Sequence, residues 1–261
     1  MSETILYTVQ DGVATITLNR PERYNAFVTG MNEALTDAVK KAAKDNTVRV
    51  VVITGAGDKA FCSGQDVKDV ADKTGARNLG DSVRHRYNPM IAAIRNLNKP
   101  VLCRLNGVAA GAGCSVALAC DMIIASDNAT LIEIFVNIGL VLDSGSSYFL
   151  PRLVGSARAF EMCTMAKKLT ASQALEWGIV NRVVSSDKLD EAVKEYTDYY
   201  VSAPTKAIGL IKKMLQKSFH SDLDSMLDTE AYFQEIAGSS KDYQEGVAAF
   251  NEKRKPNFLG H

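Results

Sequence analysis

A single carboxylate, Asp143, stands between an apolar run and a turn of serine and glycine in the stretch IGLVLDSGSS at residues 138–147. A carboxylate at the edge of a core is costly unless it is hydrogen-bonded, paired or neutralised. Asp143 therefore either caps a helix that begins near residues 145–147 or is kept for acid–base chemistry. The residues of this stretch, taken alone, favour the cap.

Two glycine-containing breaks follow apolar segments of β-forming residues: FCSGQD at residues 61–66 and GVAAGAG at residues 107–113. Glycine allows a sharp turn and lets a ligand approach main-chain N–H groups. If the two turns converge, a pair of N–H groups can polarise one carbonyl oxygen, which is the arrangement called an oxyanion hole. The second break is equally consistent with a tightly packed helix start.

Other kinds of site are disfavoured by the motifs. Neither break has the GK[ST] ending of a phosphate loop or the GxGxxG spacing of a dinucleotide site. Ser115 is not in a GxSxG context, and the three histidines are scattered along the chain, so a serine hydrolase is disfavoured. We also expect no metal, because His and Cys do not cluster at ligand spacing.

The composition is that of a globular protein, and the chain is long enough to be an enzyme. The 261 residues are 46% hydrophobic and 23% charged, with 30 basic and 30 acidic side chains, so neither disorder nor nucleic-acid binding is expected. The five cysteines form no CxxC pair and are interpreted as reduced thiols of a cytoplasmic protein. No secretion signal or membrane-spanning run is evident, so no membrane association is expected.

Hydrophobic periodicity predicts an α/β fold. A hairpin is expected at residues 5–18, followed by a helix over 29–44 and a buried strand over 48–54. Strand, glycine-rich turn and helix then recur through residue 125, which indicates stacked ββα units. From residue 157 the pattern becomes helical. We therefore divide the chain into an α/β core, 1–185, that binds the substrate and a helical C-terminal region, 186–261.

Five segments, in order along the chain, resemble the enoyl-CoA hydratase/isomerase (crotonase) family: residues 18–27, 51–69, 98–126, 150–155 and 174–184. The resemblance implies a spiral of ββα units with a helical C-terminal trimerisation region. It also implies an acyl-CoA substrate and a homotrimer or a dimer of trimers. No cofactor is implied, because coenzyme A is part of the substrate.

Carried over position by position, the resemblance places the oxyanion hole at the main-chain N–H groups of Gln65 and Ala112. It places the coenzyme A arm beside Asp66, Val67 and Lys68, although a helix start with ordinary surface charges would explain the two charged side chains equally. Other candidates for coenzyme A contacts are Arg23, for a phosphate, and Phe250 and Lys253, for the adenine end, sometimes from a neighbouring subunit. For the last two, a packed aromatic and a solvated lysine are the alternatives.

Departures from the family pattern indicate the reaction. Hydratases of the family carry two glutamates that handle water, and Ser115 and Phe135 stand at those positions. Glu133 is near in sequence but is expected to point away from the direction of Phe135. Asp143 remains as the acid–base candidate. One carboxylate suits an isomerase, because it can remove a proton at one carbon and return it at another. An apolar wall at Phe135 would raise the pKa of the Asp143 carboxyl.

Four further segments, residues 82–97, 107–121, 139–155 and 241–260, resemble family isomerases that convert 2-(1,2-epoxy-1,2-dihydrophenyl)acetyl-CoA to its oxepin and shift enoyl-CoA double bonds from position 3 to position 2. Leu142 departs from them, because a proline usually precedes the aspartate. Tyr87 and Tyr148 are candidates for an aromatic acyl pocket. Alternatives are an aliphatic enoyl-CoA isomerase or hydratase, a catalytically silent CoA-binding relative, and an RNA-binding family member.

Overall fold

The computed structural model describes residues 3–68 and 78–261, so Asp69, the last residue of the second family motif, lies outside it. The chain starts with the predicted hairpin, in which β1 (Ile5–Gln10) pairs antiparallel with β2 (Val13–Leu18). Asp11 and Gly12 have φ angles of 50° and 82°. Two consecutive positive φ angles are typical of a type I′ turn, whose twist matches that of the flanking strands. The hairpin forms the edge of its sheet, as expected.

The strands form two sheets. The larger sheet has six strands in the order β1-β2-β3-β5-β7-β10, and the smaller has four in the order β4-β6-β8-β9. After the hairpin, the larger sheet is parallel throughout, and in the smaller sheet only β8 and β9 are antiparallel. The remaining strands are β3 (Val50–Gly55), β4 (Ala60–Cys62), β5 (Val101–Leu105), β6 (Val108–Ala110), β7 (Met122–Ser126), β8 (Thr130–Ile132), β9 (Leu169–Thr170) and β10 (Arg182–Val184).

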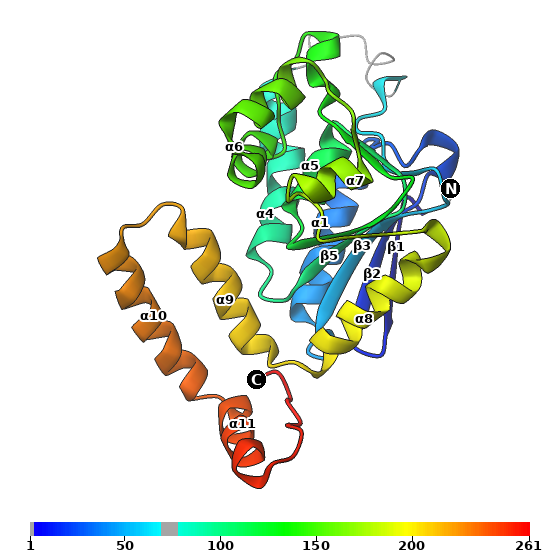
Figure 1. The fold of residues 1–261 in the computed structure, drawn as a ribbon. Coiled ribbons are helices and arrows are strands. Elements are labelled where there is room, and N and C mark those ends of the chain that lie inside the picture. The colour runs from blue at the N-terminus through cyan, green and yellow to red at the C-terminus, as the bar shows by residue number, and fades with distance from the viewer. Residues whose placement is uncertain (1–2, 69–77) are drawn as a thin grey trace.

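Successive repeats build both sheets together. In each of the pairs β3 and β4, β5 and β6, and β7 and β8, the first strand enters the larger sheet and the second enters the smaller one. The chain then crosses to the next parallel position, so the repeats stack beside one another (Figure 1). This arrangement confirms the predicted spiral of ββα units. Its consequence for the site is that turns from different repeats meet at one end of the sheets.

The helices lie close to their predicted positions, with two differences. Residues 79–87, for which no helix was predicted, are helical. The segment predicted as a helix from residue 157 is the second half of α6, which begins at Ser146 and is interrupted at Gly155, where φ is 77°. Proline and glycine usually end a helix, so the sequence did not predict the first half of α6, which contains Pro151 and ends near Gly155. The α-helices are α1 (Met31–Lys44), α3 (Leu79–Ser82), α4 (Asn88–Asn96), α5 (Ala112–Ala119), α6 (Ser146–Thr164), α7 (Ala171–Glu176), α8 (Leu189–Ser202), α9 (Thr205–Ser218), α10 (Leu223–Gly238) and α11 (Lys241–Glu252). Three short segments are 3-10 helices, namely η1 (Pro21–Arg23), η3 (Ile134–Ile138) and η4 (Ser186–Lys188), and η2 (Val83–Tyr87) is a π-helix.

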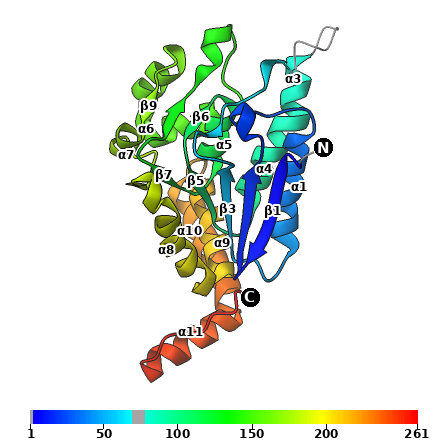
Figure 2. The same ribbon diagram turned by 90° about the vertical axis from the view of Figure 1, so that its right-hand side faces the viewer.

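Both faces of the larger sheet are covered. Val51 and Ile53 of β3 belong to the main core, which includes residues of α1 and α4, whereas Val50 and Val52 belong to a second core with residues of α8. Figure 2 shows α1 and α4 on one side of the strands and α8 on the other. A strand that is buried on both faces is apolar along its whole length, as the run VRVVVIT predicted.

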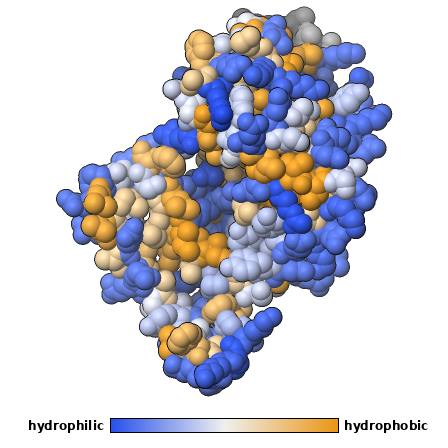
Figure 3. Space-filling view, viewed as in Figure 1, coloured by the Kyte–Doolittle hydropathy of each residue, from blue (hydrophilic) through white to orange (hydrophobic). Residues whose placement is uncertain are grey.

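The region 186–261 contains helices and no strand within the part of the chain that is described. Its first long helix, α8, packs on the sheet, whereas α9, α10 and α11 form an arm that extends from the body (Figure 1). Apolar side chains gather on the arm (Figure 3). The exposed ones on α9, on α10 and in the turn between them include Ile211, Leu215, Phe219, Leu223 and Leu227. Across residues 3–68 and 78–261, no helix is both long and apolar enough to cross a membrane.

Candidate active site

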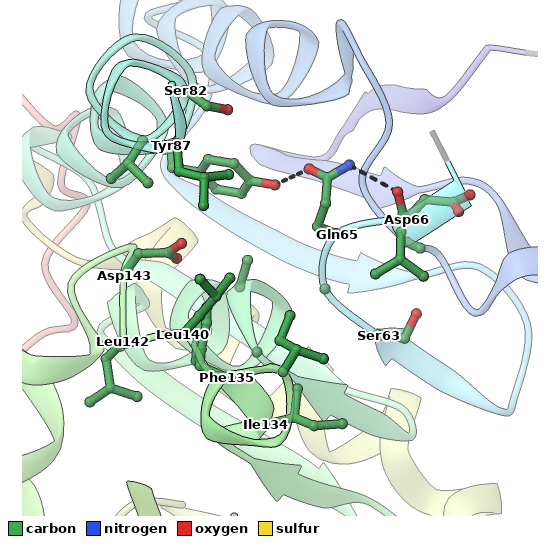
Figure 4. A pocket seen from close by; sticks show the side chains of 18 of the residues that line it. Ser63, Gln65, Asp66, Ser82, Tyr87, Ile134, Phe135, Leu140, Leu142 and Asp143 are labelled. Atoms are coloured by element: carbon green, nitrogen blue, oxygen red, sulfur yellow. Dashed lines mark hydrogen bonds between the residues drawn. The ribbon is translucent and has the colours of Figure 1, made fainter. Parts of the chain in front are cut away.

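A cavity of about 1010 Å³ opens where the turns of the ββα units meet. Its walls come from the η1 loop, the segment after β4, the helices α3 to α5, and the η3 loop that leads to α6. Figure 4 shows Asp143 beneath Tyr87, with Phe135 and Leu140 beside it. Predicted site residues that line the cavity are Arg23, Gln65, Asp66, Val67, Ala112, Phe135 and Asp143.

The two glycine-containing breaks converge. Gly64 has a φ of 90°, and a Cβ there would lie 2.9 Å from the Ala110 carbonyl oxygen and 3.5 Å from the Ala112 nitrogen. Only glycine fits such a contact at a positive φ. The absence of a side chain at position 64 therefore lets the loop before Gln65 lie against the start of α5.

The N–H groups of Gln65 and Ala112 are suited to bind an oxyanion. Ala112 is the first residue of α5, so its N–H has no partner within the helix. The β-bridge between Gln65 and Phe27 consists of two hydrogen bonds made by the neighbours of Gln65. The Phe27 N–H donates to the Gly64 carbonyl, and the Asp66 N–H donates to the Phe27 carbonyl. Within residues 3–68 and 78–261, neither the Gln65 nor the Ala112 N–H donates a hydrogen bond. Both donors line the cavity, as the oxyanion-hole prediction requires.

The Gln65 side chain is fixed by three hydrogen bonds, one of which runs from Nε2 to the Asp66 carbonyl at 3.3 Å. Tyr87 donates its hydroxyl to Gln65 Oε1, and Gln65 Nε2 donates to the Phe27 carbonyl at 2.9 Å. Tyr87 is buried, and burial, with a contribution from Asp143, raises the pKa of its phenol, so it remains a donor at neutral pH. Tyr87 was predicted only as part of an aromatic wall. The structure adds that its hydroxyl holds the side chain of Gln65, whose N–H is one of the two predicted oxyanion donors.

Asp143 lies at the apolar side of the cavity. Burial raises the pKa of its carboxyl, and a hydrogen bond from Ser144 Oγ to Asp143 Oδ1, 2.7 Å long, partly opposes this effect. Leu142 and Phe135 line the same wall. A carboxylate in such surroundings is a stronger base than one in water, because its charge is less well solvated.

The helix-cap interpretation of Asp143 is wrong. The residue at the N-cap of α6 is Gly145, with a φ of 84°, and no side chain caps this helix. Asp143 contributes its main-chain carbonyl to the turn, accepting from the Ser146 N–H at 3.2 Å. The Asp143 side chain therefore does not cap α6 and instead faces the cavity.

Ser115 and Phe135 provide no acid or base. Phe135 forms a wall of the cavity, and the buried Ser115 hydroxyl bonds to Ser146 and to the Gly111 carbonyl. Glu133 is not among the residues that line the cavity; it is fully buried, whereas Phe135 lines the cavity, so the two side chains point in different directions, as expected. Asp143 is thus the carboxylate at the apolar end of the pocket.

The candidates for coenzyme A contacts differ in where they lie. Arg23 lies exposed at the rim, and Val67 is 63% exposed beside it. Asp66 is paired with Arg20 at 3.1 Å and accepts the Lys68 N–H at 3.1 Å, which supports a structural role for its carboxylate. Lys68 follows the rim but is not part of the cavity wall.

Phe250 and Lys253 lie on and just after α11, at the end of the arm, and are not brought to the cavity of the same chain. Phe250 is 84% exposed, so it is not the packed aromatic that was considered as an alternative. Tyr148 also lies away from the cavity, with its hydroxyl 2.9 Å from His220 Nε2. Within residues 3–68 and 78–261, no three His, Cys, Asp or Glu side chains are placed to hold a metal ion.

Residues 8–261 match the family described as enoyl-CoA hydratase/isomerase. The chain belongs to this family. Among its relatives, the 1,2-epoxyphenylacetyl-CoA isomerase of Escherichia coli K12 is 43% identical over 100% of both chains, and the trans-2-decenoyl-[acyl-carrier-protein] isomerase of Streptococcus mutans is 35% identical over 98% of each. A crystal structure of the Bacillus anthracis enoyl-CoA hydratase superposes with a TM-score of 0.94, at 31% identity, over 99% of this chain and 100% of that one. Family membership and fold are therefore as predicted.

In this family member we expect Tyr87→Phe to lower kcat about tenfold, with a smaller change in KM. The substitution removes one hydrogen bond that fixes Gln65, a bond worth about 1 kcal/mol, and loosens a donor that acts most strongly in the transition state. Steady-state kinetics of thioester turnover measure the effect. Tyr148→Phe is the matched control, because that hydroxyl bonds to His220 outside the cavity. Equal kinetics for the two variants would show that the bond to Gln65 is unimportant.

Proposed function

We propose that this chain is an acyl-CoA isomerase that uses one carboxylate, Asp143, and an oxyanion hole formed by the N–H groups of Gln65 and Ala112. The observation that carries the proposal is the position of Asp143 on the apolar wall of the cavity, with a raised pKa, while Ser115 and Phe135 supply no second acid or base. Hydration needs a group that activates water, and an apolar wall excludes water.

The proposed reaction is an internal proton transfer. Asp143 removes a proton from the carbon next to the thioester carbonyl, and the negative charge moves to the carbonyl oxygen between the two N–H donors. The same carboxyl then returns the proton to a carbon further along the conjugated system. Substrate and product have the same atoms, and no added cofactor enters the step.

For the acyl group we propose the ring epoxide of phenylacetyl-CoA, 2-(1,2-epoxy-1,2-dihydrophenyl)acetyl-CoA, with its oxepin as product. In this substrate the bond between the two epoxide carbons breaks as the proton is transferred, which expands the six-membered ring to the seven-membered oxepin without a change in composition. The 43% identical relative named for 1,2-epoxyphenylacetyl-CoA supports this choice. Tyr87 and Phe135 line the acyl end of the cavity and suit a planar ring. A second candidate is an aliphatic 3-enoyl thioester, favoured by the apolar side chains Ile138, Leu140 and Val141 at the rim.

The test compares three thioesters at equal concentration: the ring epoxide, trans-3-hexenoyl-CoA and crotonyl-CoA. We expect isomerisation of the first two and hydration of crotonyl-CoA at least 100-fold slower, because general acid–base help for water contributes roughly 10²–10⁴-fold and is missing here. The ratio of kcat/KM for the first two identifies the acyl group. Hydration as fast as isomerisation, or binding of all three without turnover, would contradict the proposal.

We further propose that the chain acts in the cytoplasm as a homotrimer or a dimer of trimers. The apolar side chains on α9 and α10 are exposed in the single chain, and covering them would remove apolar surface from water. In such an assembly Phe250 and Lys253 would be available to the coenzyme A of a neighbouring subunit. Their distance from the cavity of their own chain supports that assignment.

A further inference from the structure

Glu133 is a buried carboxyl group that the proposed reaction does not use. It lies between β8 and η3, with 0% of its surface exposed. Neither of its carboxylate oxygens makes a full hydrogen bond with a described residue. An ionised carboxylate in such a place is strongly disfavoured, so the group keeps its proton.

The surroundings of Glu133 explain its protonation. Burial raises the pKa of Glu133 to about 8; the nearby Ser146 hydroxyl and Cys114 thiol lower it in part, and Asp143 raises it. The titratable groups that face it are Asp143 of the loop, Cys114 of α5 and Cys163 of α6. Burial raises the pKa of both thiols, so both are neutral at pH 7. Of these three groups around Glu133, Asp143 is therefore the one that carries a charge.

A chain of contacts leads from Glu133 to the loop of Asp143. Ser146, beside Glu133, is the first residue of α6, and its hydroxyl bonds to that of Ser115. Both hydroxyls lie 3.3 Å from the Asp143 main-chain carbonyl oxygen. A protonated carboxyl can donate as well as accept, so Glu133 can complete this buried group of hydroxyls, whereas an ionised one cannot donate.

We propose that Glu133 is a positioning residue for Asp143: its protonated carboxyl supports the Ser146 and Ser115 hydroxyls beneath the loop, and loss of the proton lowers the isomerisation rate. The inference rests on the proposed acid–base role of Asp143. Ionised Glu133 adds a second buried negative charge near Asp143, and it has no proton that it could donate to the Ser146 and Ser115 hydroxyls. Both effects disturb the direction of the Asp143 carboxylate.

The test measures kcat and KM from pH 6 to 10 for the wild type, Glu133→Gln and Glu133→Ala. For the wild type we expect kcat to fall about tenfold between its plateau and pH 9, as one proton leaves. In Glu133→Gln, which keeps a donor and cannot ionise, this alkaline decline should be absent. Glu133→Ala should lower kcat at every pH with little change in KM, and Gln should restore most of the loss.

Thermal unfolding of the same variants gives a second readout. Folded Glu133 titrates near pH 8 and the unfolded residue near 4.5, so the wild type loses stability as pH rises between these values. The melting temperature of Glu133→Gln relative to the wild type should therefore rise from pH 5 to 8 and then level off. Glu176→Gln, an exposed residue at the end of α7, should show no such trend.

Each outcome decides the inference. Superimposable pH profiles of kcat for the wild type and Glu133→Gln would overturn it, as would a melting-temperature difference that does not depend on pH. If Asp143→Asn is inactive while Glu133→Gln behaves as the wild type, only the role of Glu133 is wrong. If Asp143→Asn keeps full activity, or the wild type isomerises no thioester, the proposed function fails and this inference fails with it.

Discussion

Replacing Asp143 with Asn should lower kcat for thioester isomerisation roughly 10³-fold, because proton transfer by a positioned side chain contributes about 10²–10⁴-fold. Asn has the same shape and can still accept from Ser144, so the loop is retained. KM should stay within about a factor of three, since the lost interaction acts in the transition state and not in substrate binding. Steady-state kinetics with the ring epoxide and with trans-3-hexenoyl-CoA measure both parameters.

The wild-type pH profile gives an independent view of Asp143. Burial raises the pKa of this carboxyl, and the ionised form is the base, so kcat/KM should fall on the acid side at a pH above the usual aspartate range.

Asp58→Asn is the matched control for Asp143→Asn, because Asp58 is exposed on the loop between β3 and β4. Near-full activity of Asp143→Asn, or an equal loss in Asp58→Asn, would refute the assigned role.

Replacing Lys212 with Met should lower the free energy of unfolding by about 3 kcal/mol and the melting temperature by about 10 °C. Lys212, on α9, is buried and donates to Asp121 Oδ2 at 2.7 Å and to the Ile94 carbonyl at 3.1 Å. Burial lowers the pKa of its ammonium, and Asp121 opposes that effect. Methionine keeps the length of the side chain but leaves Asp121 without this partner, which is the costly part of the change.

Thermal unfolding at one fixed protein concentration measures this effect, because association would otherwise shift the melting temperature. Lys213→Met is the matched control, since Lys213 is the next residue on α9 and is exposed. It should change the melting temperature by less than about 2 °C, as surface substitutions usually do. If Lys212→Met and Lys213→Met have the same melting temperature, the buried pair of Lys212 and Asp121 does not hold the C-terminal arm to the core.

Much of the fold could be predicted from the chain. The hairpin turn at Asp11 and Gly12, the apolar strand β3 and the amphipathic helix α1 are local patterns, and local patterns predict local structure. The first half of α6 was missed because Pro151 and Gly155 suggest an end where the helix continues with a kink. Packing against the η3 loop and α5 outweighs the local preference there.

The candidate site was predictable in its residues but not in its contacts. Gln65, Ala112 and Asp143 followed from family motifs, and the structure places all three around one cavity. The support that Tyr87 gives to Gln65 joins residues 22 positions apart in sequence. No local pattern encodes such a contact, because it depends on how η2 and the segment after β4 come together.

The sequence by itself determined the family, the order of the ββα units and the absence of the hydratase glutamates at Ser115 and Phe135. Only the tertiary structure decided where the carboxyl groups lie. The sequence predicted that Glu133 would point away from Phe135, but it did not predict that this carboxyl group is fully buried. Asp143 faces the cavity and Glu133 is sealed beneath it. The physical reason is desolvation, which depends on every atom that surrounds a charge and therefore on packing between distant segments.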